Sequence, residues 1–180
     1  MISLCFGGNN VDFYNAEKRL WKFYQSVGVK QPSDITLYHF DHLIDCQVYH
    51  RVGRTSFVHI DSTYHIFLDE SQPLYERRVE LAHEFGHIFL HTGYQNSLSI
   101  IAQRQEHEAD LAALHMLIPT PLLWQAMIYD EWPYTIAELS QTFGVPEWFM
   151  TKRLNLFRHH ITKKYPHYYK MLCEKYNWGS

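Results

Sequence analysis

The sequence is poor in cysteine and lacks any long apolar run or internal repeat. Its three cysteines, Cys5, Cys46 and Cys173, are widely spaced, and no two of them form a Cys-x-x-Cys pair. This usage excludes a disulfide framework and a zinc ribbon, and it suits a reducing compartment. No apolar stretch approaches the roughly eighteen residues that a spanning helix needs. Residues 1–8 have no basic segment, so we expect no signal peptide and a cytoplasmic location.

The composition indicates a folded chain. Of its 180 residues, 46% are hydrophobic and 16% aromatic, which is enough to form a sizeable core in one domain. The net charge of −3 conceals an asymmetry, because residues 151–180 contain seven Lys or Arg and one acidic residue. Such a basic tail can contact nucleic acid or an acidic partner. A solvated helix that complements an acidic body explains it equally well.

Hydrophobic periodicity predicts the order of the elements. Residues 11–26 have apolar residues at helical spacing, and a shorter helix is expected at about 34–44. Period-two alternation from 47 to 69 predicts three strands, the last two joined as a hairpin at 61–63. Further helices follow, the last pair spaced like a helix-turn-helix around Gly144. The predicted elements after residue 44 are strands at 48–52, 55–60 and 64–68, helices at 73–92 and 103–118, and a pair of helices within 135–154.

The most informative stretch is His83-Glu84-x-x-His87 within the helix predicted at 73–92. Histidines at i and i+4 lie on one helical face, about 6 Å apart along the axis, and can both bind one Zn²⁺. Glu84 is displaced around the helix and is placed to act as general base on a metal-bound water. The surrounding residues predict a buried helix. Burying two imidazoles and a carboxylate is costly unless a metal satisfies them.

The third ligand decides the class of metal site. His91 lies about 12 Å from His83 along the same axis, so the two cannot bind one ion. The metzincin arrangement would require glycine at 90 and histidine at 93, and the chain has Leu and Gly there. Glu106 and Glu108 remain as candidates. We favour Glu106, because Asp110 lies four residues later on the same face and can accept the free ring N–H of a ligand histidine.

The segments Leu81–His91 and Glu106-x-Glu-Ala-Asp110, with Leu117-Ile-Pro119, resemble the ImmA/IrrE family of bacterial and phage metallopeptidases. The resemblance implies an α+β fold: a compact zincin-like domain with a small antiparallel sheet packed on the active-site helix and a second ligand helix. It also implies His83, His87 and Glu106 as zinc ligands and Glu84 as catalytic base. We expect one domain, 1–180, with a helical part at 1–45, a catalytic core at 46–119 and a helical part with a basic tail at 120–180.

The function expected from this resemblance is zinc-dependent cleavage of a helix-turn-helix repressor encoded by a phage or mobile element. The oxyanion donor is open among Tyr94, His107 and His115, and an extended substrate is expected to pair with the edge of strand 64–68. The main alternative is a DNA-binding or repressor-binding regulator without proteolysis, based on residues 135–154. Against DNA binding, Trp148, Phe149, Met150 and Leu154 are expected in the core. A metal-bound module that only sequesters a partner is a second alternative. No membrane partner is expected.

Overall fold

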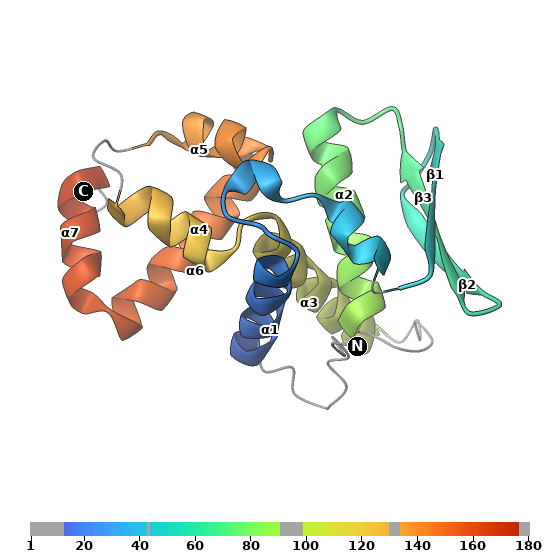
Figure 1. Ribbon diagram of the computed structural model, residues 1–180, viewed down its shortest axis with the longest axis horizontal. Helices are drawn as coiled ribbons and strands as arrows, with labels where there is room; N and C mark the ends of the chain where they lie inside the picture. The colour runs from blue at the N-terminus through green and yellow to red at the C-terminus, as the bar shows by residue number, and fades with distance from the viewer. Residues whose placement is uncertain (1–12, 43, 91–98, 130–133, 177–180) are drawn as a thin grey trace.

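The computed structural model describes residues 13–42, 44–90, 99–129 and 134–176 (Figure 1). The α-helices in chain order are α1 (Phe13–Ser26), α2 (Leu74–Leu90), α3 (Ser99–Leu117), α4 (Thr120–Trp124), α5 (Ile136–Phe143), α6 (Glu147–Lys164) and α7 (Pro166–Tyr176). The strands are β1 (Cys46–Arg51), β2 (Ser56–Ile60) and β3 (Thr63–Asp69). Short turns of other helix types are η1 (Pro32–Asp34), η2 (Leu37–His42) and η3 (Gln125–Tyr129).

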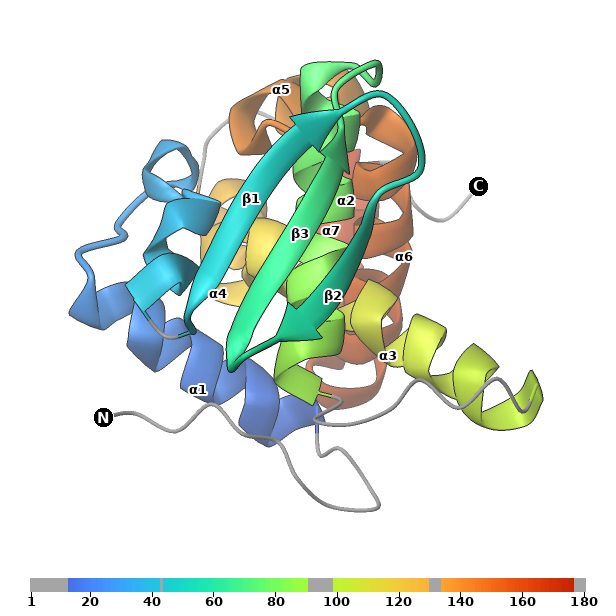
Figure 2. The same cartoon turned by 90° about the vertical axis from the view of Figure 1, so that its right-hand side faces the viewer.

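The fold is α+β, as predicted, with the sheet at one end of the molecule. Helix α2 packs behind the sheet, and α3 packs against α2 (Figures 1 and 2). The helices α4 to α7 lie on the side of α2 away from the sheet (Figure 1). In the described part of the chain, no single helix is long and apolar enough to cross a membrane; one pair, 102–117 with 120–128, meets those criteria together but is bent by 55°.

The sheet is mixed rather than antiparallel, so this part of the prediction is wrong. Its strand order is β1-β3-β2, with β2 antiparallel and β1 parallel to β3. The predicted hairpin is present, and Asp61 and Ser62 adopt the positive φ angles, 49° and 71°, of a tight two-residue turn. Because β3 lies in the centre, neither of its edges can pair with a substrate. Period-two alternation specifies a strand but not the direction of its neighbours.

The helix predicted at 34–44 is replaced by two short 3₁₀ segments. The Asp34 carboxylate accepts backbone N–H groups of Lys30 and Gln31, at 2.9 and 3.1 Å, which fixes the first turn. In the second segment, Leu37 and Phe40 are both buried three residues apart, the repeat of a 3₁₀-helix. The tighter helix therefore places both side chains on the core.

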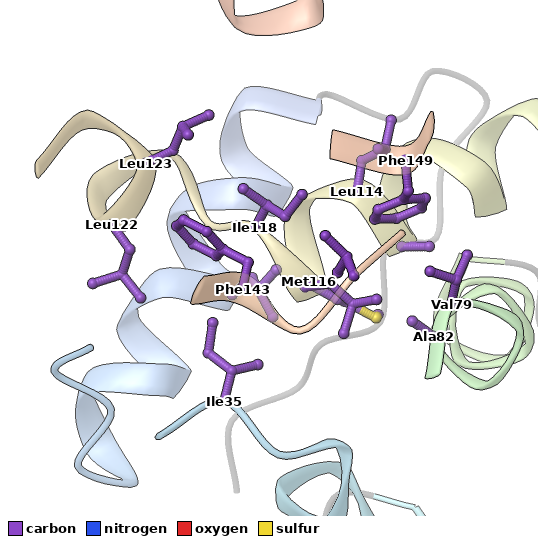
Figure 3. Packing of buried hydrophobic residues seen from close by; sticks show 14 of the residues in the cluster. Ile35, Val79, Ala82, Leu114, Met116, Ile118, Leu122, Leu123, Phe143 and Phe149 are labelled. Carbon is purple, nitrogen blue, oxygen red and sulfur yellow. The ribbon is translucent and has the colours of Figure 1, made fainter. Parts of the chain in front are cut away.

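One hydrophobic core connects the helical layers (Figure 3). The predicted face of α1 is confirmed where it is described, since Leu20, Phe23 and Tyr24 are buried. The Tyr24 hydroxyl donates a hydrogen bond of 2.6 Å to the Met116 carbonyl on α3. Figure 3 shows side chains from α2, α3, α4, α5 and α6 meeting in the same cluster; its labelled residues are Ile35, Val79, Ala82, Leu114, Met116, Ile118, Leu122, Leu123, Phe143 and Phe149.

The helix-turn-helix spacing at 135–154 is confirmed. Thr135 and Glu138 form a capping box at the start of α5, and Gly144 ends this helix with a φ of 62°. At the start of α6, Phe149, Met150 and Leu154 are buried as expected. Trp148 is 52% exposed, so its assignment to the core is wrong. Its ring lies beside α2 instead.

A buried ionic network holds α6 to the other helices. Arg153 on α6 is 1% exposed and donates hydrogen bonds to the Ile118 carbonyl, at 2.9 Å, and to the Thr120 hydroxyl, at 2.5 Å. Glu17 on α1 lies 3.9 Å from Arg153 and 3.1 Å from His115. Burial alone would raise the pKa of Glu17, but the hydrogen bonds from His115 and Thr120 and the charges of His115 and Arg153 lower it to about 2.

Replacing Glu17 should make the free energy of unfolding depend less on pH in the acid range. A carboxyl group whose pKa is depressed by folding stabilises the protein above its ordinary pKa of 4.5, and this stabilisation is lost as the pH falls toward 2. We expect Glu17→Gln to lower the free energy of unfolding at pH 7 by up to about 3 kcal/mol. The difference from the parent protein should shrink steadily below pH 4.5.

Urea unfolding at pH 7, 4 and 3 measures this difference. Glu174→Gln, at an exposed position on α7, is the matched control and should change little at any of these pH values. A Glu17→Gln penalty that is the same at pH 3 as at pH 7 would show that the carboxylate charge does not stabilise the fold.

Candidate metal centre

Helix α2 carries the predicted histidines into the interior. Pro73 precedes its first turn, where a missing N–H leaves no hydrogen bond unmade. The first turn is exposed, and nearly all the side chains from Val79 to Leu90 are buried or half-buried against the sheet and α3. The His83 side chain is 23% exposed and that of His87 is 4% exposed. The predicted central helix is therefore present, with its motif at the buried end.

The side chains of His83, His87 and Glu106 meet at one point. The two imidazole Nε2 atoms are 3.0 Å apart, and each lies 3.3 Å from a different oxygen of the Glu106 carboxylate. All three ligating atoms lie within 4.8 Å of one another. Tetrahedral zinc with bonds of about 2.0–2.1 Å separates neighbouring ligand atoms by roughly 3.3–3.4 Å. The donor set and its spacing therefore fit a metal ion of this type.

Asp110 orients one of these histidines. Its Oδ1 atom lies 3.0 Å from His83 Nδ1, so it accepts the ring N–H and leaves Nε2 facing His87 and Glu106. The other carboxylate oxygen accepts a hydrogen bond of 2.5 Å from Lys152 on α6. The hydrogen bond from His83, aided by Lys152, lowers the pKa of Asp110 to about 2. Asp110 is therefore an ionised acceptor at neutral pH.

Glu84 occupies a buried position beside the three converging side chains. It is 9% exposed, and this burial raises the pKa of its carboxyl group to about 7. The charges of Glu106 and Glu80 act in the same direction, while those of His83 and Arg54 oppose the rise. A carboxyl group with this pKa can both accept and release a proton near neutrality.

Glu84 and His83 line a cleft of about 500 Å³. Its walls come from α2 and α3, from residues 54 and 55 before β2, from the end of β3 and from the start of α6. Two α6 side chains reach across it: Lys152 to Asp110, and Trp148, whose indole N–H donates to the Glu76 carboxylate at 3.0 Å. Local sequence patterns do not predict these two contacts, because both join residues more than 40 positions apart.

Gly86 allows α2 and α3 to approach closely. A Cβ atom at this position would lie 3.0 Å from the Ala109 Cα and 2.8 Å from its carbonyl oxygen, and the second distance is shorter than Cβ atoms in proteins show. The neighbouring positions on the two helices are His87 and Glu106, so the same close approach brings the ligand candidates together. A glycine inside a predicted helix was the available signal for this contact.

The remaining predicted residues fall elsewhere. Glu108 is buried and pairs with Arg104 at 2.8 Å, away from the two histidines, as its position on the helix implied. Among the expected oxyanion donors, His115 faces Glu17 on α1 and His107 is exposed on α3. Tyr94, His91 and the predicted helix end at residues 92 and 93 lie outside the described residues. His115 is therefore excluded as a donor, and Arg54, which lines the cleft, is a candidate that the sequence did not suggest.

Comparisons with known proteins match most of the chain. The model of the Peptidase_M78 family, the IrrE N-terminal-like domain, matches residues 36–155. The phage-like element PBSX protein XkdA of Bacillus subtilis (strain 168) is 24% identical over 142 residues, which cover 78% of this chain and 72% of XkdA. The uncharacterized protein YqaB of the same organism is 21% identical over 141 residues, which cover 78% of this chain and 82% of YqaB.

The close approach at Gly86 predicts that a glycine-to-alanine change in this helix lowers the free energy of unfolding, whereas such a change in a helix usually raises it. Helix propensity alone would make Gly86→Ala stabilising by about 1 kcal/mol. The clash with Ala109 backbone atoms should outweigh this and lower the free energy of unfolding by about 1–3 kcal/mol. Urea unfolding of the metal-free protein measures the change.

A double variant tests whether the clash with the backbone of residue 109 causes the loss of stability. Because the contact is with the backbone of residue 109, adding Ala109→Gly to Gly86→Ala should not restore stability. A stabilised Gly86→Ala protein, or a full rescue by the second change, would be incompatible with this packing.

Proposed function

Because the chain belongs to the Peptidase_M78 family, a peptidase family with the IrrE N-terminal-like domain, we propose that it is a zinc-dependent endopeptidase. Zn²⁺ would be held by His83 and His87 of α2 and Glu106 of α3. The single observation that carries the proposal is the convergence of these three side chains, whose two nitrogens and one carboxylate offer ligating atoms within 4.8 Å of one another. A site with three protein ligands leaves one position open, as catalytic zinc sites do.

Zinc in such a site supplies a Lewis acid that polarises a carbonyl group and lowers the pKa of bound water. The chain supplies the proton transfer. Glu84 is buried and lines the cleft beside His83, and its pKa of about 7 would suit a group that takes a proton and returns it to the leaving amine. Asp110 holds His83 in the tautomer whose Nε2 faces the metal position. Each of these roles belongs to one side chain in a fixed position.

The substrate would lie in the cleft beside β2. This strand is an edge of the three-stranded sheet in the described part of the chain, whereas β3 is not. The ring centroids of Phe57 on β2 and His87 are 6.4 Å apart, so a peptide added to this edge would pass close to the metal position. Arg54 precedes β2 in the cleft wall and is a candidate donor to the developing oxyanion.

The proposed substrate is a helix-turn-helix repressor of a phage or mobile element. The name of XkdA places that relative in a phage-like element, which supports such a setting for this chain. A repressor encoded by a neighbouring reading frame is the first candidate to test. Identification of that frame would reduce the search to one protein.

A DNA-binding or repressor-binding regulator without proteolysis is the second candidate, and the α5–α6 helix-turn-helix favours it. However, Trp148 and Lys152, at the start of the helix that would enter a DNA groove, contact Glu76 and Asp110 instead. Salt-dependent binding to random duplex DNA would favour this alternative. Stoichiometric binding of an intact repressor would favour a binding module.

Substitution of the general base should separate metal binding from cleavage. We expect Glu84→Gln to abolish cleavage of the co-expressed neighbouring repressor while the protein keeps one zinc per chain, because Glu84 is not a ligand. Mass analysis of repressor fragments and metal analysis of the purified protein provide the two readouts. An intact repressor with the zinc-loaded parent protein would contradict the proposed substrate, and loss of zinc from Glu84→Gln would contradict the assigned role.

Two glutamates on the same helix test the third ligand. Glu106→Ala should weaken zinc binding by at least about 100-fold, which exceeds the usual effect of losing a residue that only supports a ligand. Glu108→Ala is the matched control and should keep the parent affinity, because Glu108 pairs with Arg104 rather than with the histidines. Competition with a chromophoric chelator measures both affinities. Equal effects of the two changes would exclude Glu106 as a specific ligand.

A further inference from the structure

A second cavity lies on the other side of α2, between this helix and the sheet. Its volume is about 390 Å³, and it is enclosed by α2, by β1 and β3, and by residues 36 and 37 (Figure 2 shows α2 behind these strands). The α2 residues that line it are Leu74, Arg77, Arg78, Leu81 and Phe85. Those that line the cleft of the candidate metal centre are residues 76, 79, 80, 83 and 84. The two sets occupy different faces of α2, so this helix is a wall of both.

The second cavity differs from the metal cleft in charge. Five carboxylates line the metal cleft, from Asp69, Glu76, Glu80, Glu84 and Asp110. Among the described residues that line the second cavity, none is acidic, and Arg77, Arg78 and His50 are basic. The other walls are mainly apolar, from Val48, Leu68 and the α2 side chains. A mostly apolar cavity of this size with a few polar groups is the usual form of a small-molecule site.

The two arginines in this cavity are used differently. The Arg78 guanidinium donates to three backbone carbonyls, those of Ile35 at 2.8 Å, Phe143 at 3.0 Å and Gly144 at 3.3 Å. Arg78 therefore ties α2 to the turns before η2 and after α5. The Nε atom of Arg77 is buried and has no hydrogen-bond partner. A buried donor left unsatisfied destabilises the protein, and more strongly when it carries charge.

We propose that this cavity binds a small amphipathic anion. Its carboxylate or phosphate head would lie at Arg77, and its aliphatic body would lie against Val48, Leu68 and Leu81. An anionic head would satisfy the Arg77 guanidinium in the paired geometry that arginine forms with both groups. The aliphatic body would fill the apolar part of the cavity and remove its surface from water. The excess of basic over acidic side chains selects an anion rather than a cation or a neutral molecule.

Calorimetric titration of the full-length protein with four probes tests this site. Decanoate and decyl phosphate, kept below their micelle concentrations, should bind saturably with one molecule per chain, and their relative affinities identify the preferred head group. Decanol should bind at least about tenfold more weakly, because it lacks the charge that pairs with Arg77. Inorganic phosphate should also bind more weakly than decyl phosphate, because it lacks the aliphatic body.

Two variants locate the binding site. Arg77→Gln should weaken binding of the preferred anion at least about tenfold. Leu74 is 67% exposed at the edge of the cavity, so Leu74→Glu should weaken binding by adding a like charge without disturbing the core. The matched control is Arg51→Gln, since Arg51 is an exposed residue of β1 whose guanidinium lies over the Phe67 ring, outside the cavity.

Thermal unfolding separates a ligand site from a structural role of Arg77. Because Arg77 Nε makes no hydrogen bond, Arg77→Gln should leave the melting temperature of the ligand-free protein unchanged or slightly raised. A marked fall in the melting temperature would show that Arg77 stabilises the fold and would overturn the proposal. The proposal is also overturned if decanol binds as tightly as the anions, if no anion binds at millimolar concentration, or if Arg77→Gln binds like the parent protein.

Discussion

The close contact between α2 and α3 at Gly86 is the constraint on which the candidate metal centre depends. The glycine has no Cβ, so the Ala109 backbone can lie against α2 at a distance that any other residue would prevent. This approach brings Glu106 to within 3.3 Å of both His83 and His87. A side chain at residue 86 would separate the two helices, and a three-residue donor set requires both of them.

The C-terminal helices do more than complete the core. Arg153, buried on α6, is hydrogen-bonded to the backbone after α3, and Arg78 on α2 binds the carbonyls of the turn between α5 and α6. Lys152 on α6 reaches the same Asp110 that orients His83. The helix-turn-helix therefore forms part of the wall of the cleft at the candidate metal centre. A partner that displaced α6 would disturb the contacts of Asp110.

Helix α2 combines two environments on different faces. Toward α3 it presents His83 and Glu84 to a cleft lined by five carboxylates, where a dication would offset their charge. Toward the sheet it presents Leu81, Phe85 and the guanidinium of Arg77 to a cavity without acidic lining residues among those described. One helix of 17 residues thus borders two cavities whose lining side chains differ in charge.

The sequence by itself determined the family, the α+β class, most of the helix and strand positions and the three side chains that converge as candidate metal donors. These follow from local spacing: i and i+4 histidines, period-two strands, and a second carboxylate four residues after Glu106. Only the tertiary structure decided that β1 runs parallel to β3, that Trp148 lies in the cleft wall rather than the core, and that the Nε of Arg77 is buried without a partner. Pairing direction and side-chain partners depend on residues far apart in the chain, and local periodicity carries no record of them.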